Sequence, residues 1–334
     1  MNRIMVLAAM VMLTFVAAVR GDGPTVAAVT NWQLQAVDED GVGTYDATDK
    51  VTITGIVLNN PEEMLDPTPS TTGMGGQWQV YIQGEGSDHA GTAVYMGQNY
   101  VMMGGGNETA DQWSSKMWSA NHDPNTGYTF HIGDRVSVTG WYTFYDGKTN
   151  INQQHNTDPF YDFNVVLVTP AAGLPQPETI TLSMVKNSSN QFIFDPTRTT
   201  GCEYYQARLV RVDDVNITDP NDWAPNNTLT VMDNAGRTFP LLLGIGDGFT
   251  KYSCPTGQIS IIGIFDQEST DNTDGYRLWV TNYDGNGLVL TDRRHKRGNL
   301  PGDINSDYMV DFTDFAELAN NWLQQAPGLY PGSP

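Results

Sequence analysis

Near the C-terminus, oxygen-bearing side chains recur with the spacing of a loop that wraps one calcium ion. They occupy positions 1, 3, 5, 9 and 12 of residues 303–314, and the main-chain carbonyl at position 7 adds a further oxygen. Ca²⁺ prefers several hard oxygen ligands held on a flexible loop. The predicted ligands are Asp303, Asn305, Asp307, Met309 through its carbonyl, Asp311 and Asp314. The alternative is an acidic surface loop that binds no metal.

An amphipathic helix is predicted to follow this loop, because apolar residues recur there at three- and four-residue steps. Loop and helix together, residues 302–324, resemble one repeat of a type I dockerin, which also carries Asp at position 12 of the loop, as Asp314 does here. The resemblance implies a cohesin-type domain as the partner. The chain departs from the dockerin pattern in two ways: Tyr308 stands where the turn usually has Gly, and one repeat is visible instead of two.

An export signal is predicted at residues 1–18. Asn2 and Arg3 form a short positive region, residues 4–16 are apolar, and small residues follow for cleavage. This apolar run is too short to span a bilayer comfortably, and no later run predicts a membrane helix. We expect the mature protein to be secreted, extracellular or at the cell surface, where Ca²⁺ is plentiful.

The charge balance argues against a nucleic-acid partner. Seventeen basic residues stand against 38 acidic ones, which gives a net charge of −21. A surface this negative repels polyanions and suits a neutral partner such as an extracellular glycan. The exception is a basic cluster at residues 293–297, within a segment, residues 292–301, that we interpret as a solvated linker.

The chain has two cysteines, Cys202 and Cys254. In an exported protein, an even count without metal-ligand spacing favours a disulfide, so we predict that these two residues pair.

Before residue 312 the sequence predicts a mainly β protein. Runs rich in β-branched and aromatic residues end at Gly, Asn, Asp or Pro, whereas helical periodicity is scarce. We predict a first β module at residues 25–169 and a second at residues 178–291, joined by a Pro-rich linker at residues 170–177.

The sequence indicates that the two modules are copies of one unit, because their strand-like runs correspond in order and length. The first module contains VTITGIVLNN, QWQVYIQG, GTAVYMG and GDRVSVTGWYTFYDGKTNI. The second contains YQARLVRVDDV, LTVMDNAG, RTFPLLLG, GQISIIGIFDQ and DGYRLWVTN. Residues 97–130 are then an insertion in the first copy.

Five strands in this order, with the segment at residues 133–140 in the fourth place, resemble the OB-fold modules of secreted bacterial proteins. The resemblance implies two tandem OB-like β-barrels, a small Greek-key architecture whose open face binds oligonucleotides or sugars. A pair of β-sandwiches is the structural alternative.

No group of residues predicts catalysis. The five histidines are scattered, and none lies in a recognised catalytic or metal-binding motif. Residues 84–92 collect Glu, Ser, Asp and His, but neighbouring side chains of one turn diverge, so we predict a polar hairpin loop there. Trp113 and Trp118 stand among polar residues of the insertion, where exposed rings suit stacking on sugars; plugging a barrel mouth is the alternative.

Together these features favour a secreted, non-catalytic, calcium-binding protein whose β modules bind a glycan or another extracellular ligand. Its dockerin-like tail would attach it to an extracellular or cell-surface assembly. The competing hypotheses are an exported hydrolase of polysaccharide or phosphoesters with the same tail, and a purely structural envelope protein.

Overall fold

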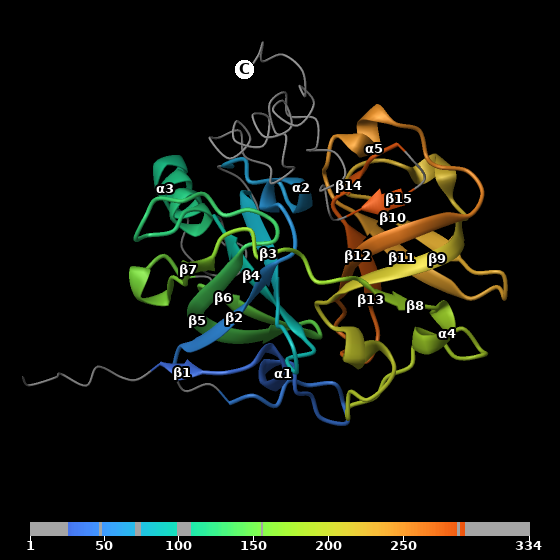
Figure 1. Ribbon diagram of the computed structural model, residues 1–334, viewed down its shortest axis with the longest axis horizontal. Helices are drawn as coiled ribbons and strands as arrows, with labels where there is room; N and C mark the ends of the chain where they lie inside the picture. The colour runs from blue at the N-terminus through green and yellow to red at the C-terminus, as the bar shows by residue number, and fades with distance from the viewer. Residues whose placement is uncertain are drawn as a thin grey trace, which may run out of the picture.

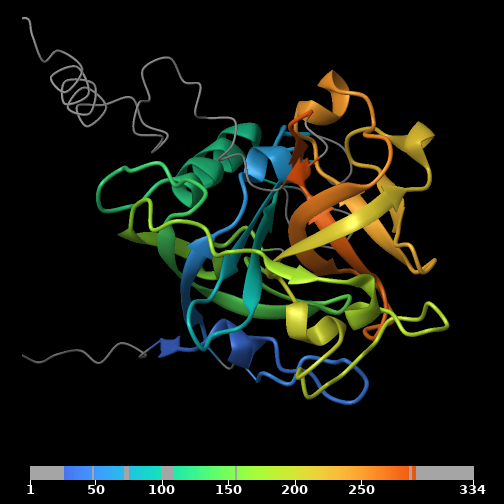
Figure 2. The same cartoon turned by 45° about the vertical axis from the view of Figure 1, so that its right-hand side comes forward.

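A computed structural model of the chain shows two closed β-barrels side by side (Figures 1 and 2). The predicted signal peptide, the basic linker and the calcium loop with its helix lie outside the residues that the structure describes. The described residues are 26–46, 49–70, 75–98, 108–154, 156–285 and, for the main chain, 288–290.

The first barrel closes with five strands. They are β2 (Val51–Val57), β3 (Gln77–Gln83), β4 (Gly91–Gly97), β5 (Arg135–Tyr145) and β6 (Lys148–Asn152). Strands β2, β3 and β4 pair antiparallel in sequence, β4 pairs parallel with β6, β6 antiparallel with β5, and β5 returns antiparallel to β2. This closed order is that of an OB-like Greek-key barrel.

The second barrel repeats these pairings. Its strands are β9 (Leu209–Ile217), β10 (Thr228–Met232), β11 (Thr238–Leu243), β12 (Ile259–Gln267) and β13 (Tyr276–Val280). Strand β10 pairs antiparallel with both β9 and β11, β11 runs parallel to β13, and β12 joins β13 to β9. The predicted mainly β fold with two OB-like barrels is confirmed, and so is the correspondence between the copies.

Apolar side chains at alternate positions along the strands fill the interior of each barrel. In β3, Trp78, Val80 and Ile82 point into the first core, where Val136 and Val138 of β5 meet them. In the second barrel, Leu229 and Val231 of β10 face Phe239 and Leu241 of β11 in the equivalent core. Apolar residues at every second position therefore close both sheets around one interior each.

The predicted insertion lengthens a connection that both barrels possess. Between β4 and β5 the chain forms α3 (Ala110–Asn121), and at the same place in the second barrel it forms the single turn α5 (Gly248–Lys251). Thr109 caps α3 by accepting a hydrogen bond from the amide of Gln112, whose side chain accepts one from the amide of Thr109. Helix α3 lies on the side of the first barrel away from the second (Figure 1).

The duplication extends upstream of the barrels. Each copy begins with a short strand parallel to its first barrel strand, followed by one helical turn: β1 (Ala27–Ala28) and α1 (Asn31–Leu34), then β8 (Glu178–Ile180) and α4 (Leu182–Val185). The next turn is also repeated. Asp38 accepts hydrogen bonds from the amides of residues 40 and 42, and Asn187 from those of residues 189 and 191.

Shorter elements complete the structure. Strand β7 (Asn164–Thr169) extends the first sheet beside β5, and β15 (Leu288–Leu290) runs parallel to β12 with β14 (Asn282–Tyr283) at its edge. Single helical turns occupy the loops: α2 (Pro61–Met64), η2 (Pro159–Tyr161), η3 (Cys202–Tyr205) and η4 (Pro220–Asp222).

A buried interface, which we call the joint, fixes the barrels to each other. Its apolar residues from the first barrel are Ile56, Leu58, Met64, Tyr81 and Ala93. Those from the second are Ala207, Leu209, Leu242, Ile264 and Trp279. Leu174, in the segment predicted as an inter-domain linker, is buried in the same cluster, where it packs with residues of both barrels.

A buried ion cluster crosses the joint. Asp266 of β12 is 1% exposed and lies 3.0 Å from Lys148 Nζ of β6 and 2.7 Å from Arg277 Nε of β13. Tyr81 of β3 donates a hydrogen bond of 2.5 Å to the same carboxylate. Burial raises the pKa of Asp266, but the charges of Lys148 and Arg277 more than offset this, and the pKa lies below its ordinary value.

Candidate functional site

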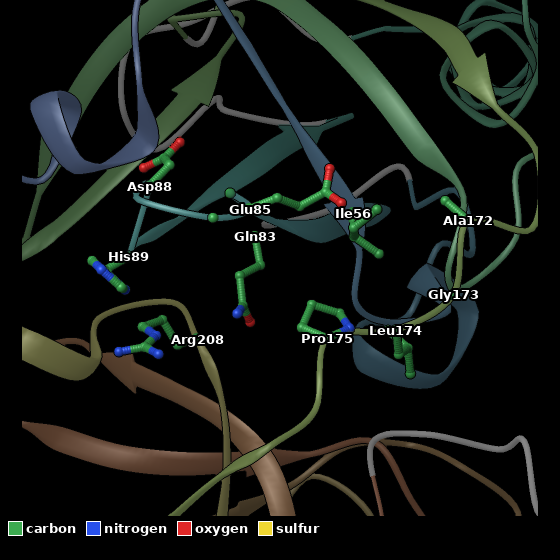
Figure 3. A pocket seen from close by; sticks show the side chains of 12 residues that line it. Ile56, Gln83, Glu85, Asp88, His89, Ala172, Gly173, Leu174, Pro175 and Arg208 are labelled. Atoms are coloured by element: carbon green, nitrogen blue, oxygen red, sulfur yellow. The ribbon is translucent and has the colours of Figure 1, made fainter.

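A cleft of about 330 Å³ opens where the two barrels meet the segment between them. It is lined by the β3–β4 loop, by residues 172–175, and by the side chains of Ile56, Gln83 and Arg208 (Figure 3). Ile56, Leu174 and Pro175 form its apolar side, whereas Glu85, Asp88 and His89 lie on the polar side. A volume of this size is at the lower end of the range for small-molecule sites, about 300–1,000 Å³.

The polar loop of the cleft is the hairpin predicted for residues 84–92. Asp88 accepts hydrogen bonds from the amides of Asn31 and Trp32 at 2.8 and 2.7 Å, so it holds the first turn of α1. Glu85 accepts two bonds of 2.6 Å from Arg135, and this pairing raises the pKa of the guanidinium. Both carboxylates therefore have a structural partner.

The loop contains no nucleophile paired with a base. No hydrogen bond joins Ser87 to His89 among the described residues, and the His89 ring instead packs between Trp32 and Tyr204, with centroids 6.4 Å from each. A covalent mechanism requires such a pair within hydrogen-bond reach.

The floor of the cleft is formed by two buried polar side chains. Arg208 is 8% exposed, and its Nη2 lies 2.7 Å from a carboxylate oxygen of Glu178. The central carbon of its guanidinium group, Cζ, lies 5.1 Å from the centre of the Tyr204 ring. Gln83 is 7% exposed and accepts a 2.9 Å hydrogen bond from the amide of Leu209. Sequence reasoning missed both, because Gln83 ends β3 and Arg208 directly precedes β9, and each reaches the cleft only through the pairing of the barrels.

A group of rings forms a second candidate surface, which we call the ring cluster: Trp141, Phe160 and Tyr161. Their centroids lie 5.2–6.0 Å apart, and Phe160 is 59% exposed. Lys50 lies 5.6 Å from the Phe160 ring and donates a hydrogen bond to the carbonyl of Asp162. Exposed rings with polar neighbours can stack on the apolar faces of sugars.

The two tryptophans predicted to bind ligand differ in environment. Trp113 is fully buried: its ring belongs to the first core and its Nε1 donates to the carbonyl of Pro67 at 2.7 Å. The prediction for Trp113 is wrong, because this ring lies on the face of α3 that packs on the barrel. Trp118 is 56% exposed and stacks on His122 at 4.4 Å, so its ligand role stays a prediction.

The face that OB-folds commonly offer to ligands is partly covered in the first barrel, where Gln77 and Tyr95 are its half-buried residues. That face is made by the second and third barrel strands, here β3 and β4. Their outward side chains Tyr81 and Ala93 lie in the joint, and Tyr81 packs edge-on against Trp279 at 6.4 Å. A ligand cannot reach these residues while the barrels are joined.

The equivalent face of the second barrel is more open. Thr228, Thr230 and Met232 of β10 and Thr238 and Pro240 of β11 are exposed or half-buried. None of these side chains is aromatic. This face therefore has no ring for stacking on a base or a sugar.

The predicted disulfide is not formed, because both cysteines are free. Cys202 is buried with its sulfur 3.4 Å from the carbonyl of Val185 in α4, whereas Cys254 follows α5. Helices α4 and α5 lie at opposite ends of the second barrel (Figure 1). Burial raises the pKa of both thiols.

The calcium ligands predicted at residues 303–314 lie outside the described residues. Within the described part of the chain, no group of three or more His, Cys, Asp or Glu is placed to hold a metal ion. None of its helices is long and apolar enough to cross a membrane.

Comparison with solved structures gives a weak neighbour of the chain. It is a chain of a replication protein A heterotrimer bound to single-stranded DNA, at 9% sequence identity and a TM-score of 0.22; the match covers 85% of this chain and 73% of that one. No protein-family model and no curated protein matches the sequence. At this level of similarity the neighbour says nothing of function, and the OB-like fold follows from the strand pairings themselves.

Proposed function

We propose that this is a secreted, non-catalytic, calcium-binding protein whose body binds an extracellular glycan. Its C-terminal loop and helix, residues 302–324, attach it to an extracellular or cell-surface assembly through a cohesin-type domain. The observation that carries the proposal is the spacing of oxygen ligands over residues 303–314, followed directly by an amphipathic helical pattern.

The body supports a binding role in two ways. The ring cluster exposes apolar surface that contributes little to either core, and the net charge of −21 favours a neutral partner over a polyanion. The carboxylates beside the cleft already hold Arg135 and the first turn of α1. A glycan stacked on the rings fits these observations better than a substrate cleaved between two free carboxylates.

Calcium titration of the full mature chain tests the attachment segment. Isothermal titration should give one saturable site, and the double variant Asp303→Ala, Asp314→Ala should lose it. Glu39→Ala, Asp40→Ala is the matched control, because it removes the same charge from an exposed turn of the first module. Absence of binding heat at millimolar calcium, or equal loss in the control, would contradict the proposal.

Glycan binding is tested on the same chain with a panel of neutral polysaccharides. Phe160→Ala should weaken binding to a recognised polysaccharide roughly tenfold, since stacking on a ring contributes about 1 kcal/mol or more. Tyr145→Ala is the control: this ring is 48% exposed on β5 but lies outside the ring cluster. Shortening of the polysaccharide during the assay would indicate an exported hydrolase instead.

A further inference from the structure

The cleft between the barrels contains hydrogen-bonding groups that the protein itself leaves unused. Nε and Nη1 of Arg208 are buried and have no hydrogen-bond partner within the described residues, and only Nη2 is paired, with Glu178. Buried donors on a charged group are costly to leave unpaired, and such groups in native proteins usually have a partner. Water or a ligand is the remaining source of acceptors at this position.

Gln83 adds a further donor beside Arg208. Its Oε1 accepts the amide of Leu209, which fixes the orientation of the side chain, and no bond within the described residues uses its NH₂ group. Figure 3 shows this side chain projecting between Arg208 and Pro175. The cleft thus combines two hydrogen-bond-donating side chains, Arg208 and Gln83, with an apolar side formed by Ile56 and Leu174.

The charges around the cleft argue against an anionic ligand. Arg208 and Arg135 supply two positive charges. Glu85, Asp88 and Glu178 supply three negative ones. The local balance is therefore negative, as is the whole chain at −21. A carboxylate or phosphate would be repelled, whereas a neutral polyhydroxylated ring offers acceptors to Arg208 and donors to the free lone pairs of the carboxylates.

We propose that this cleft binds one neutral pyranose ring. Its polar edge would face Arg208 and Gln83, and its apolar face would lie against Ile56, Leu174 and Pro175. The volume of about 330 Å³ suits a ligand of this size. The inference deepens the proposed glycan binding by naming a site and a ligand class, and it lies on a different surface from the ring cluster.

Isothermal titration of the full chain with neutral methyl hexosides, the corresponding uronates and inorganic phosphate tests the site. At least one neutral hexoside should bind saturably, and more tightly than its uronate. Arg208→Gln should weaken that binding roughly tenfold or more, because a hydrogen bond from a charged donor is lost. Arg211→Gln is the matched control: it lies on β9, three residues after Arg208, and is also paired with a carboxylate, Asp213, but lies outside the cleft.

Ala172→Trp provides a second variant that does not disturb a buried group. Ala172 is exposed at the edge of the cleft, so a large side chain there should obstruct the sugar without unfolding the protein. Unchanged hexoside affinity in both variants, saturable binding of the uronate or phosphate alone, or no binding of any hexoside would each overturn the inference. If polysaccharide binding then still depends on Phe160, the proposed glycan function survives without the cleft.

Discussion

The two barrels have the same strand order but bury only partly equivalent faces in the joint. The first contributes the outer side of β3 and β4, with Tyr81 and Ala93, whereas the second contributes Ile264 of β12 and Trp279 of β13 together with Leu242 of β11. A duplicated fold has thus produced an interface in which equivalent surfaces meet only in part, through Leu242 of β11. The joint therefore covers the usual OB ligand face unequally: in the first barrel it buries Tyr81 and Ala93, whereas in the second it buries Leu242 and leaves Thr228, Thr230 and Pro240, none of them a ring, exposed or half-buried.

The barrels differ again away from the joint. The first has the long helix α3, the ring cluster and the exposed Trp118, whereas the second has only the single turn α5 at the equivalent place. The exposed rings that suit a glycan are therefore concentrated on the first barrel, whose ordinary ligand face is partly covered. We interpret the second barrel mainly as the partner that completes the joint and the cleft.

The largest expected effect comes from removing the buried charge at the joint. Asp266→Ala leaves Lys148 and Arg277 without their shared carboxylate, and should lower the free energy of unfolding by about 3–5 kcal/mol. Urea denaturation near neutral pH measures the change. Glu268→Ala is the control, since Glu268 contacts the same two cations but is 44% exposed, and should cost about 1 kcal/mol or less. Equal losses in the two variants would contradict a joint held by the buried ion cluster.

A second prediction compares the pH responses of two buried carboxylates. Burial raises the pKa of Glu203, inside the second barrel, to about 7, although Tyr276 donates it a 2.5 Å hydrogen bond. Because the folded state keeps this proton longer than the unfolded state, stability falls as pH rises from about 4.5 to about 7. Glu203→Gln should remove that slope. The free energy of unfolding of the variant, relative to that of the unmodified chain, should therefore be about 3 kcal/mol higher at pH 8 than at pH 5.

The joint carboxylate should respond in the opposite sense. The pKa of Asp266 is lowered overall. The stability that its charge contributes to the folded state is therefore complete above about pH 4, the pKa range of an unfolded Asp, and is lost as pH falls further. Urea denaturation of Glu203→Gln, Asp266→Ala and the unmodified chain from pH 3 to pH 8 measures how the free energy of unfolding changes with pH in each. Parallel stability curves for the unmodified chain and Glu203→Gln between pH 5 and pH 8 would rule out an ionisable Glu203 in the barrel.

A smaller effect is expected at Gly91, whose backbone packs closely against that of residues 206–207 next to the second barrel. A Cβ atom added at Gly91 would lie 2.0 Å from the carbonyl oxygen of Ala207, so Gly91→Ala must separate the barrels locally and should cost about 2 kcal/mol. Gly86→Ala in the same hairpin loop meets no atom within 4 Å and bears only the strain of its positive φ, about 1 kcal/mol. Thermal unfolding of the two variants measures the difference, and a smaller loss for Gly91→Ala would contradict the close joint.

Much of the barrel architecture could be predicted from the sequence. Alternating runs such as residues 77–83 and 228–232 identify strands locally, and their repeated order identifies the duplication. The upstream repeat was missed because its helical turns at residues 31–34 and 182–185 share few residue types; they correspond through capping and turn geometry.

The candidate site was less predictable, because it depends on contacts between distant segments. Trp113 stands among polar residues, yet it lies on the buried face of α3, and only the packing of that helix reveals this. Arg208 and Gln83 lie 125 residues apart in sequence and meet only across the joint. Nothing in the local sequence pattern around either residue indicates which barrel face will be covered.

Hydrogen–deuterium exchange of the full chain, with and without a recognised neutral polysaccharide, tests most directly the claim that the barrels bind ligand unequally. The account predicts added protection in the β3–β4 loop, at residues 172–175 and around residues 159–162, with little change in β10 and β11. Protection confined to β10 and β11 would contradict it, since the ligand would then occupy the ordinary OB face of the second barrel.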